Sequence, residues 1–579
     1  MKIVSTPTCL GPATRMPVAC AILLIAVILT GCDTSVEPVV ESADLVLRGG
    51  KIVTVDDSNP EVSALAARNG MIIALGSDEE VAAFIGDATE VIELEGQLAI
   101  PGFIEGHGHF LSLGDAKIQL DLRFADSWQD ILDQVAAAAA EAAPGEWIRG
   151  RGWHQDKWSS VPEPNVEGFP IHASLSELTP HNPVLLTHAS GHAVFVNAKA
   201  MQLAGVDALT PDPQGGEILK DAQGRPMGLF REEAESLIQA ARTAASDSEG
   251  RKKAQLATEE CLTKGVTSFQ DAGTSFEEIA LLRQLADEGK LGVRLWMMIR
   301  DSNEALAANL ASVKTFAKGN SHFAVGGVKL SIDGALGSRG AWLLEPYTDS
   351  PASTGLNLIP LESARETAEM AIEHGVQLCI HAIGDRANRE VLDLFAETFA
   401  AHPDKQDLRW RIEHAQHLNL DDIPRFVELG VIASMQTVHC TSDGPWVPDR
   451  IGDQRSEDGA YVWQKLMQSG AVVMNGTDVP VEDIDPIANF HSAVTRLMSN
   501  GLRFYPDQKM TRMEALRSTT ANAAYGVFEE HLKGTLEVGK LADVTVLSKD
   551  IMTVPEDEIL TASVVATIVG GKVAYRSSS

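Results

Sequence analysis

The two ends of the chain share one pattern of hydrophobic and polar residues. From Ala43, short apolar runs alternate with turn residues in "DLVLRGGKIVTVD", "MIIALGS" and "EVIELEGQLAIPG", and "ADVTVLS" and "VVATIVGGKVAYRS" repeat this style near the C-terminus. Such runs predict strands, with Gly49-Gly50 and Asn69-Gly70 as hairpin turns. Because neither end holds enough strands for a stable sheet, we predict one β-sandwich built from residues 43–100 and 531–579.

The middle of the chain alternates differently, because short apolar runs are followed there by helix-like segments. Eight such runs occur: "LAIPGFIEGHGHF", "GVTSFQDAG", "GVRLWMMIR", "GGVKLSIDGALGSR", "GVQLCIHAIGD", "LRWRIEHAQ", "GVIASMQT" and "AVVMNGTDVP". Repeated strand–helix units predict a parallel sheet, and eight units predict an α/β chain with a (β/α)8 TIM barrel. We place this barrel at residues 101–530.

A long segment separates the first two barrel units. Residues 111–264 must contain the first helix of the barrel, which we expect to begin near Ser127 with Asp130 as its capping-box partner. A second helix-like segment covers residues 248–264. The remainder predicts an insertion at about residues 144–247.

The N-terminus has the features of an export signal. Lys2 and Arg15 precede an apolar run from Val18 to Leu29, which ends in Leu-Thr-Gly-Cys at Cys32. The alternative is a single transmembrane anchor, but this run of about 12 residues is shorter than the roughly 20 that a spanning helix needs. The segment resembles the signal peptide of bacterial lipoproteins.

That resemblance implies an exported protein. Residues 1–31 would be removed, Cys32 would carry the lipid, and residues 32–42 would form a tether to the periplasmic side of the inner or outer membrane. Met16 is an alternative to Met1 as the first residue of the protein, because the signal features, from Arg15 through the apolar run to Cys32, begin just before Met16.

Charge and cysteine content narrow the partners. The 579-residue chain has a formal net charge of -33, which repels phosphate backbones and anionic membrane surfaces and argues against a nucleic-acid partner. Three of its six cysteines belong to the signal segment, and the others are too scattered for a disulfide framework or a cysteine zinc site. We expect a small-molecule substrate and contact with the membrane only through the N-terminal lipid. The oligomeric state stays open, with a homodimer as one alternative.

Ionisable side chains stand at the ends of the predicted barrel strands, where the active site of such a barrel forms. They are His107, His109, Lys329, His381, His414 and Asp478. The two-residue alternation predicts that Lys329 and His381 face the barrel interior. His414 shares its parity with the apolar Trp410 and Ile412, so its facing stays open.

This ordered set resembles the amidohydrolase superfamily. The phrases "PGFIEGHGH", "VKLSIDGALGSR", "IHAIGDRA", "RIEHAQ", "GTDVP" and "KGTLEVGKLADVTVL" are similar to amidohydrolase family 3, the YtcJ-like group that includes N-substituted formamide deformylases. The resemblance runs from about Ala43 to the end of the chain. One departure surrounds Asp478, where many relatives have serine and tryptophan in place of Thr477 and Val479.

The resemblance implies a binuclear metal centre with two divalent ions, usually zinc. His107, His109 and Asp478 would hold one ion. His381 and His414 would hold the other. Lys329 would bridge the two ions as a carbamate formed with carbon dioxide, a reaction that needs the neutral amine.

The implied reaction is hydrolysis of a non-peptide carbon–nitrogen bond in an amide, an N-formyl or N-acyl compound, or a cyclic amide. Two ions roughly 3.5 to 4 Å apart can hold a bridging hydroxide, and Asp478 would act as general acid and base. Two alternatives remain open: a non-catalytic, surface-displayed binding lipoprotein, and a metal-dependent isomerase or C–O hydrolase on the same barrel.

Other residues are candidates for contact with substrate. In this family, phrases matching "RGRGWHQDKW" and "THASGHAVFVN" border the substrate cleft, which points to Arg151, Trp153, His154 and His192. Packing within the insertion is the alternative role for these four. Arg339 could clamp a substrate carboxylate or form a salt bridge with a nearby acid. We expect structural or surface positions for His417 and His439, and core positions for Trp410 and Trp463.

Overall fold

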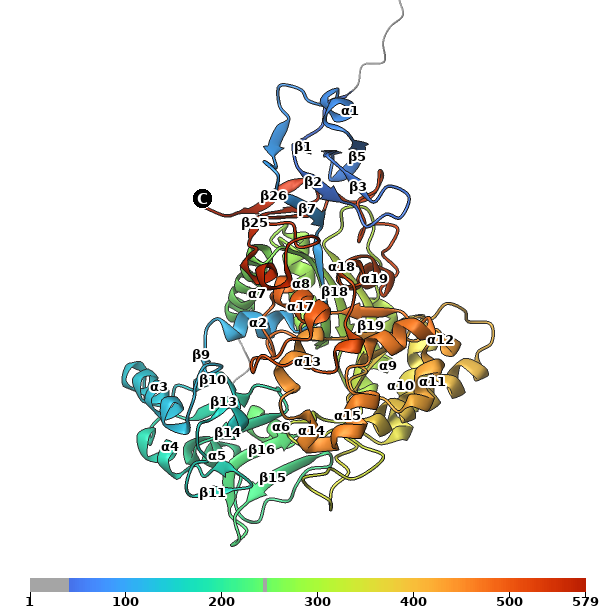
Figure 1. Cartoon of the computed structure of the whole chain (residues 1–579). Helices are drawn as coiled ribbons and strands as arrows, with labels where there is room; N and C mark the ends of the chain where they lie inside the picture. Colours follow the sequence, from blue (N-terminus) through green and yellow to red (C-terminus); the bar gives the residue numbers. More distant parts are fainter. Residues whose placement is uncertain (1–40, 243–246, 579) are drawn as a thin grey trace, which may run out of the picture. The chain divides into compact units, whose positions relative to one another are not determined.

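The central sheet of the protein is the predicted barrel. The computed structural model describes residues 41–242 and 247–578, so the predicted signal peptide, Cys32 and most of the tether lie outside the described residues. Eight parallel strands follow one another in sheet order (Figure 1): β8 (Phe103–Gly108), β17 (Val266–Thr274), β18 (Arg294–Ile299), β19 (Phe323–Ser331), β20 (Gln377–Ala382), β21 (Arg411–His414), β22 (Ile432–Met435) and β23 (Val473–Asn475). All eight predicted strands are confirmed.

Helices that lie between the strands in sequence, and one that follows the last strand, cover the outside of this sheet. They are α7 (Asp247–Thr263), α8 (Phe276–Asp287), α9 (Asn303–Val313), α10 (Leu361–His374), α11 (Asp385–Ala401), α12 (Ile423–Leu429), α16 (Trp463–Ser469) and α17 (Pro486–Thr495). On α11, Phe395 and Phe399 pack against the buried Trp410, with ring centroids 5.0 Å from it. Trp410 and Trp463 are both fully buried, which confirms their predicted core positions.

The barrel closes between β8 and β23 without a ladder of hydrogen bonds. The Asp478 backbone N–H donates to the His107 carbonyl at 2.7 Å. The buried Glu105 side chain accepts hydrogen bonds from the Thr477 backbone N–H at 2.6 Å and from the Thr477 hydroxyl at 2.8 Å. We call this junction the seam. It joins the first and last barrel strands next to the predicted site residues.

The two ends of the chain form a composite sandwich, as predicted. One sheet contains β5 (Met71–Gly76), β4 (Ala64–Arg68), β1 (Leu45–Arg48) and β6 (Glu90–Glu93). The other contains β26 (Lys572–Arg576), β25 (Val564–Val569), β24 (Val544–Leu547), β7 (Leu98–Pro101), β2 (Lys51–Val53) and β3 (Glu61–Val62). N-terminal β7 pairs with C-terminal β24, so blue and red strands lie side by side in Figure 1.

One of the two predicted hairpins is confirmed. Asn69 and Gly70, with φ angles of +51° and +82°, join the antiparallel strands β4 and β5. The prediction at Gly49-Gly50 is wrong, because β1 and β2 belong to different sheets. Gly50 instead lies against Leu94, where an added Cβ would be 2.4 Å from the leucine Cβ. The glycine pair carries the chain from one sheet to the other.

The insertion after β8 has a sheet of its own. Its strands are, in order, β15 (Gly216–Lys220), β16 (Pro226–Glu232), β14 (Ala193–Val196), β13 (Val184–His188), β10 (Ile148–Trp153) and β9 (Leu120–Asp121). Helix α3 (Trp128–Glu141) begins at Ser127 as predicted, but Asp130 accepts from the Asp126 N–H instead of completing a capping box with Ser127.

The role expected for α3 is wrong. Its buried residues pack into the core of the insertion with Ile148 and Phe195, not against the barrel. The helix that follows β8 in the barrel is α2 (Phe110–Ala116). It approaches α7 so closely that a Cβ on Gly114 would lie 1.9 Å from the Lys253 carbonyl oxygen.

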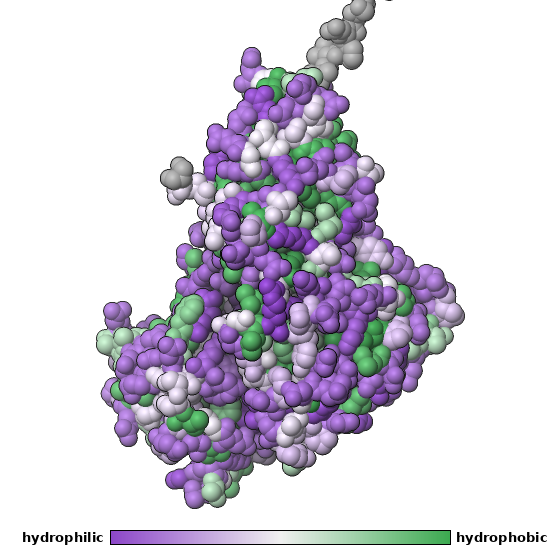
Figure 2. Space-filling view, viewed as in Figure 1, coloured by the Kyte–Doolittle hydropathy of each residue, from purple (hydrophilic) through white to green (hydrophobic). Residues whose placement is uncertain are grey.

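The surface visible in Figure 2 is mainly hydrophilic, with hydrophobic residues in small separate groups. This agrees with the excess of acidic residues in the chain. No helix within the described residues is long and apolar enough to cross a membrane. The described cysteines, Cys261, Cys379 and Cys440, are buried free thiols.

Candidate metal centre

One cavity of about 310 Å³, which we call the inner cavity, lies at the carboxyl ends of the barrel strands, and six of its ionisable lining residues stand out. They are the six that the sequence analysis singled out: His107, His109, Lys329, His381, His414 and Asp478. His107 lies in β8, Lys329 in β19, and Asp478 in the loop after β23. Residues separated widely in the sequence therefore meet at one mouth of the barrel.

His107, His109 and Asp478 lie close enough together to share an ion. The Asp478 Oδ1 atom is 3.5 Å from His107 Nε2 and 3.2 Å from His109 Nε2. The ring centroid of His414 lies 4.7 Å from that of His107 and 4.5 Å from that of His381. Imidazole and carboxylate groups gathered in this way suit a divalent cation such as zinc.

Backbone conformation brings His414 into the cavity. Regular alternation would turn it to the same side as Trp410, which packs against helix α11. However, the φ angles of His414 and Ala415 are +75° and +44°, and this left-handed conformation breaks the alternation of the strand. Residues held in that region cluster at functional sites. The facing of His414, left open by the sequence, is therefore inward.

The buried histidines of the cavity are in their neutral form. Burial lowers the pKa of His107 to about 4, and the charge of Lys329 acts in the same direction. Burial likewise lowers the pKa values of His381 and His414 well below the usual range. Neutral imidazole is the form that binds a metal ion.

Several buried polar atoms in the inner cavity have no hydrogen-bond partner among the described residues: His107 Nε2, His381 Nε2 and Asp478 Oδ1. Buried polar atoms are normally paired, so these require a reason. Within the described chain, two groups that share Asp478 could hold a metal ion: His107, His109 and Asp478, and His414, His439 and Asp478. A divalent cation fits such a set of unpaired nitrogen and oxygen atoms.

Lys329 lies on β19 with 2% of its surface exposed. Burial lowers the pKa of its amine to about 8, although the charge of Glu413 opposes the shift; the charge of Arg300 favours it. A substantial fraction of the amine is therefore uncharged in mildly basic solution. The side chain is available as a nucleophile, which an ordinary surface lysine is not.

An ion-pair network supports His107 from behind. Its Nδ1 atom is hydrogen-bonded to the Glu413 carboxylate, and Arg411 donates to both carboxylate oxygens of Glu413, at 2.7 and 3.0 Å. The side chains of Arg411 and Glu413 are fully buried. Because the carboxylate holds the Nδ1–H tautomer, Nε2 of His107 is left free to face the cavity. The sequence analysis missed Glu413, although it lies directly before His414.

Replacing Glu413 with Gln is expected to weaken binding of zinc roughly 10- to 100-fold, because an outer carboxylate orients its histidine and raises the basicity of the ring. Removing one partner of the buried pair with Arg411 should also cost roughly 3 to 5 kcal/mol of unfolding free energy. Zinc titration and denaturant unfolding measure the two effects. Glu397→Gln, which removes an exposed ion pair with Arg365, is the matched control. Equal zinc affinity in the two variants would contradict the role of Glu413.

His439 was expected to be structural or at the surface, yet it lines a second cavity. We call this space, of about 690 Å³, the outer cavity; it shares His192, His414 and Asp478 with the inner cavity. The His439 ring is stacked 6.4 Å from that of His414. It lies on helix α13 (Thr437–Asp443), which begins directly beyond the carboxyl end of barrel strand β22, so its position after a barrel strand is the sequence signal that could have indicated this placement.

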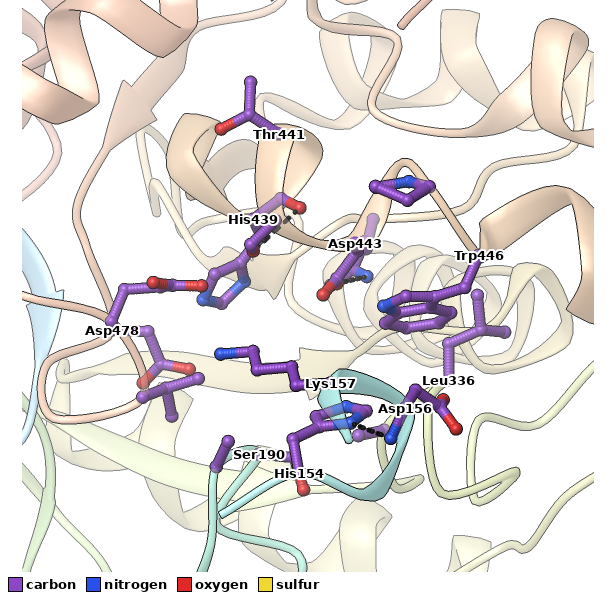
Figure 3. A pocket seen from close by; sticks show the side chains of 18 of the residues that line it. His154, Asp156, Lys157, Ser190, Leu336, His439, Thr441, Asp443, Trp446 and Asp478 are labelled. Atoms are coloured by element: carbon purple, nitrogen blue, oxygen red, sulfur yellow. Dashed lines mark hydrogen bonds between the residues drawn. The ribbon is translucent and has the colours of Figure 1, made fainter. Parts of the chain in front are cut away.

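The insertion forms one wall of the outer cavity. Figure 3 shows His154, Lys157 and Ser190 from the insertion opposite Asp443 and Trp446 from the barrel. The first three belong to the insertion between β8 and β17, and the other two to the segment between β22 and β23. The cavity is therefore bounded by two parts of the fold.

Three of the five predicted substrate contacts lie at the cavities. His154 lines the outer cavity, Arg151 lines the inner one, and His192 lines both. Burial disfavours the charged form of His192, but the charge and hydrogen bond of Glu232, 2.7 Å away, outweigh it and raise the pKa of His192.

Trp153 and Arg339 are not brought to either cavity. Trp153 is buried in the insertion, where its indole N–H donates to the Leu186 carbonyl and its ring stacks on Trp158. Arg339 donates two hydrogen bonds to Asp349, at 3.2 and 2.9 Å. Trp153 thus packs in the core of the insertion, and Arg339 is paired with a neighbouring acid. Both side chains have a structural role here instead of the expected contact with substrate.

Comparisons with known proteins agree over nearly the whole chain. The protein is 34% identical to the protein LONG AFTER FAR-RED 3 of Arabidopsis thaliana, over 92% of each chain. It is 30% identical to the putative amidohydrolase YtcJ of Bacillus subtilis, over 92% of this chain and 99% of the relative. An N-substituted formamide deformylase of Arthrobacter pascens is 26% identical, over 92% of this chain and 98% of the relative.

A solved structure has the same fold. An uncharacterized metal-dependent hydrolase from Pyrococcus horikoshii superimposes with a TM-score of 0.72 and 27% identity, covering 89% of this chain and 99% of that one. Residues 90–575 match the model of the amidohydrolase family. This match includes the barrel, the insertion and the C-terminal strands of the sandwich. The chain therefore belongs to the amidohydrolase family.

Proposed function

We propose that this protein is a metal-dependent hydrolase of a non-peptide carbon–nitrogen bond, in an amide, an N-formyl or N-acyl compound, or a cyclic amide. The observation that carries the proposal is the group formed by His107, His109 and Asp478 at one cavity, in which His107 Nε2 and Asp478 Oδ1 are buried without a hydrogen-bond partner among the described residues. The similarity to an N-substituted formamide deformylase supports the carbon–nitrogen bond as the target.

Five residues besides Lys329 would hold two divalent cations: His107, His109, His381, His414 and Asp478. When bound, such cations polarise the substrate carbonyl and lower the pKa of water toward neutrality. Lys329 would add through its neutral amine to carbon dioxide, losing one amine proton to solvent and gaining a carboxylate that can reach both ions. The low pKa of the buried amine supports this step.

Asp478 would move the proton during hydrolysis. Burial raises its pKa, but the neighbouring imidazole groups of His109, His107 and His414 outweigh this effect and lower it well below the usual range. The carboxylate is thus ionised and can accept a proton from the attacking water. It lines both cavities, so it can then deliver that proton to the leaving nitrogen.

A metal count combined with an amide screen tests the proposal. The purified protein is expected to bind about two divalent ions per chain and to hydrolyse at least one N-formyl, N-acyl or cyclic amide in a metal-dependent manner. A chain that binds divalent ions but hydrolyses only esters, or only isomerises its substrate, would show that the bond type is wrong.

Removal of the metal should reduce both activity and stability. A cation present at 1,000 times its dissociation constant stabilises the folded state by about 4 kcal/mol, so dialysis against a chelator is expected to lower the melting temperature and abolish hydrolysis. Calorimetry before and after addition of zinc measures the effect. An unchanged melting temperature, with the chelator shown to have removed the ions, would contradict the proposed ligand set.

A further inference from the structure

The two cavities differ in charge. The inner cavity is lined by the basic residues Arg151, Arg300 and Lys329 together with Glu232, Glu233 and Glu235. The outer cavity is lined by Asp126, Asp156, Asp443 and Glu482, with Lys157 as a basic residue. His192, His414 and Asp478 lie where the cavities meet. A substrate held at the junction would therefore extend one part toward arginines and the other toward acids.

Arg300 stands at the mouth of the barrel beside Lys329. It directly follows β18, and its backbone N–H donates to the Thr274 carbonyl at 3.0 Å. A Cβ added to Gly273, whose φ angle is +133°, would lie 3.1 Å from both Cβ and Cδ of Arg300 and 3.3 Å from Cγ of Lys329. The glycine thus leaves room for the two side-chain stems to run together at the edge of the inner cavity.

The Arg300 guanidinium has no hydrogen bond or ion pair with any of residues 41–242 and 247–578. Other arginines near the site are paired: Arg339 with Asp349, and Arg450 with both Asp349 and Asp156. Among the residues that the structure describes, Arg151 donates only to the carbonyl groups of Pro480 and Ala189, at 3.2 and 3.5 Å. Two guanidinium groups of the inner cavity consequently have donors to spare for a ligand.

The acids of the inner cavity do not cancel these charges. Glu232 accepts a hydrogen bond from His192, and Glu233 is exposed. Burial raises the pKa of Glu235 well above the usual range, with the charge of Glu232 acting in the same direction. Burial therefore disfavours the charged form of Glu235, so this acid opposes the arginines less than an ordinary carboxylate would.

From this arrangement we infer that Arg300, assisted by Arg151, binds a carboxylate of the substrate in the inner cavity. This inference rests on the proposed function, and it narrows the substrate to an amide that carries a carboxylate on one side of the scissile bond. A guanidinium presents a planar pair of donors that matches a carboxylate, which makes arginine better suited to this role than lysine.

The outer cavity then receives the other part of the substrate. Its four acids besides Asp478 outnumber its one lysine, Lys157, and disfavour a second carboxylate. Trp446 offers an aromatic face beside Leu336 (Figure 3). The larger volume of this cavity accommodates a bulky group. The carboxylate is accordingly directed inward, toward Arg300.

Matched substrate pairs test the inference. One pair is the monoanilide of glutaric acid and the anilide of valeric acid; the other is N-formyl-β-alanine and N-formylpropylamine. Within each pair, a carboxylate is replaced by a methyl group. A hydrogen-bonded charged partner adds a preference of roughly 10- to 100-fold, so we expect kcat/KM to be higher by that factor for the carboxylate member of at least one pair.

Two arginine variants separate the role of Arg300 from a general effect. Arg300→Gln is expected to remove the preference by lowering kcat/KM for the carboxylate substrate only, with the metal count unchanged. Arg339→Gln, at the same mouth but paired with Asp349, should keep the wild-type preference. The inference is overturned if the wild type shows no preference, if Arg300→Gln keeps it, or if Arg300→Gln slows both members of a pair equally.

Direct binding distinguishes failure of this inference from failure of the proposed function. If no variant hydrolyses any amide, the proposed function fails, and calorimetric titration with glutarate still tests the arginine. Glutarate is then expected to bind Arg300→Gln at least 10-fold more weakly than it binds the wild type and Arg339→Gln. Equal affinities for the three proteins would overturn the role of Arg300.

Discussion

Replacing Asp478 with Asn is expected to lower kcat by roughly 10²- to 10⁴-fold, the usual contribution of a general acid or base. The amide cannot take up the proton of the attacking water or return it to the leaving nitrogen. The substitution is mild for the backbone, because asparagine tolerates the left-handed conformation at Asp478, where φ is +59°. The Asn oxygen can still approach His107 and His109. Steady-state kinetics with a metal count measures both effects.

Asp483→Asn is the matched control for this variant. Asp483 lies in the same loop but contacts Arg123 and Lys264 at 3.6 Å, away from the inner cavity. Its activity should equal that of the wild type. Retained activity in Asp478→Asn would assign proton transfer to another group. Loss of the metal would instead make Asp478 mainly a ligand.

Replacing Lys329 with Ala is expected to reduce the metal content from about two ions per chain to about one or fewer, because the shared bridge between the ions is lost. Activity should fall with the metal. A short carboxylic acid such as acetate or propionate can enter the space left by the side chain and replace the carbamate oxygens. Partial recovery of metal content and activity on addition of such an acid is the result that we expect.

Lys157→Ala provides the comparison for Lys329. Lys157 is an exposed lysine that lines the outer cavity and stands outside the proposed ligand set. Its metal content should be that of the wild type. If Lys329→Ala keeps two ions, the bridge has no place in the metal centre. Rescue by propylamine as effective as rescue by propionate would show that the position needs bulk instead of carboxylate oxygens.

Much of the site was predictable because a barrel places its strand ends together. Once eight strand–helix units were recognised, the position of Lys329 or His381 within its strand was enough to direct it inward. The sandwich followed from the shortage of strands at each end of the chain. In these cases local patterns and the overall fold point to the same structure.

Other features depend on contacts that a linear pattern does not contain. Glu413 has the parity of a lumen residue, but its partner His107 lies 306 positions away. The inward facing of His414 depends on the left-handed backbone conformation of His414 and Ala415. Helix α3 has a clear N-cap and an apolar stripe, but the stripe does not show whether the helix packs against the core of the barrel or that of the insertion. Arg339 and Arg300 both follow barrel strands, and only the nearby Asp349 separates their roles.

The seam between β8 and β23 has a consequence for how the protein could release its ions. His107 and His109 lie on one side of this junction and Asp478 on the other, and only a few hydrogen bonds, several of them through Glu105, join the two sides. An ion held by all three side chains would cross-link β8 to the loop after β23, at the place where the barrel wall lacks a ladder of hydrogen bonds. Loss of that ion and parting of the two strands would then be a single event, so the speed of exchange with free zinc would report how often the barrel opens.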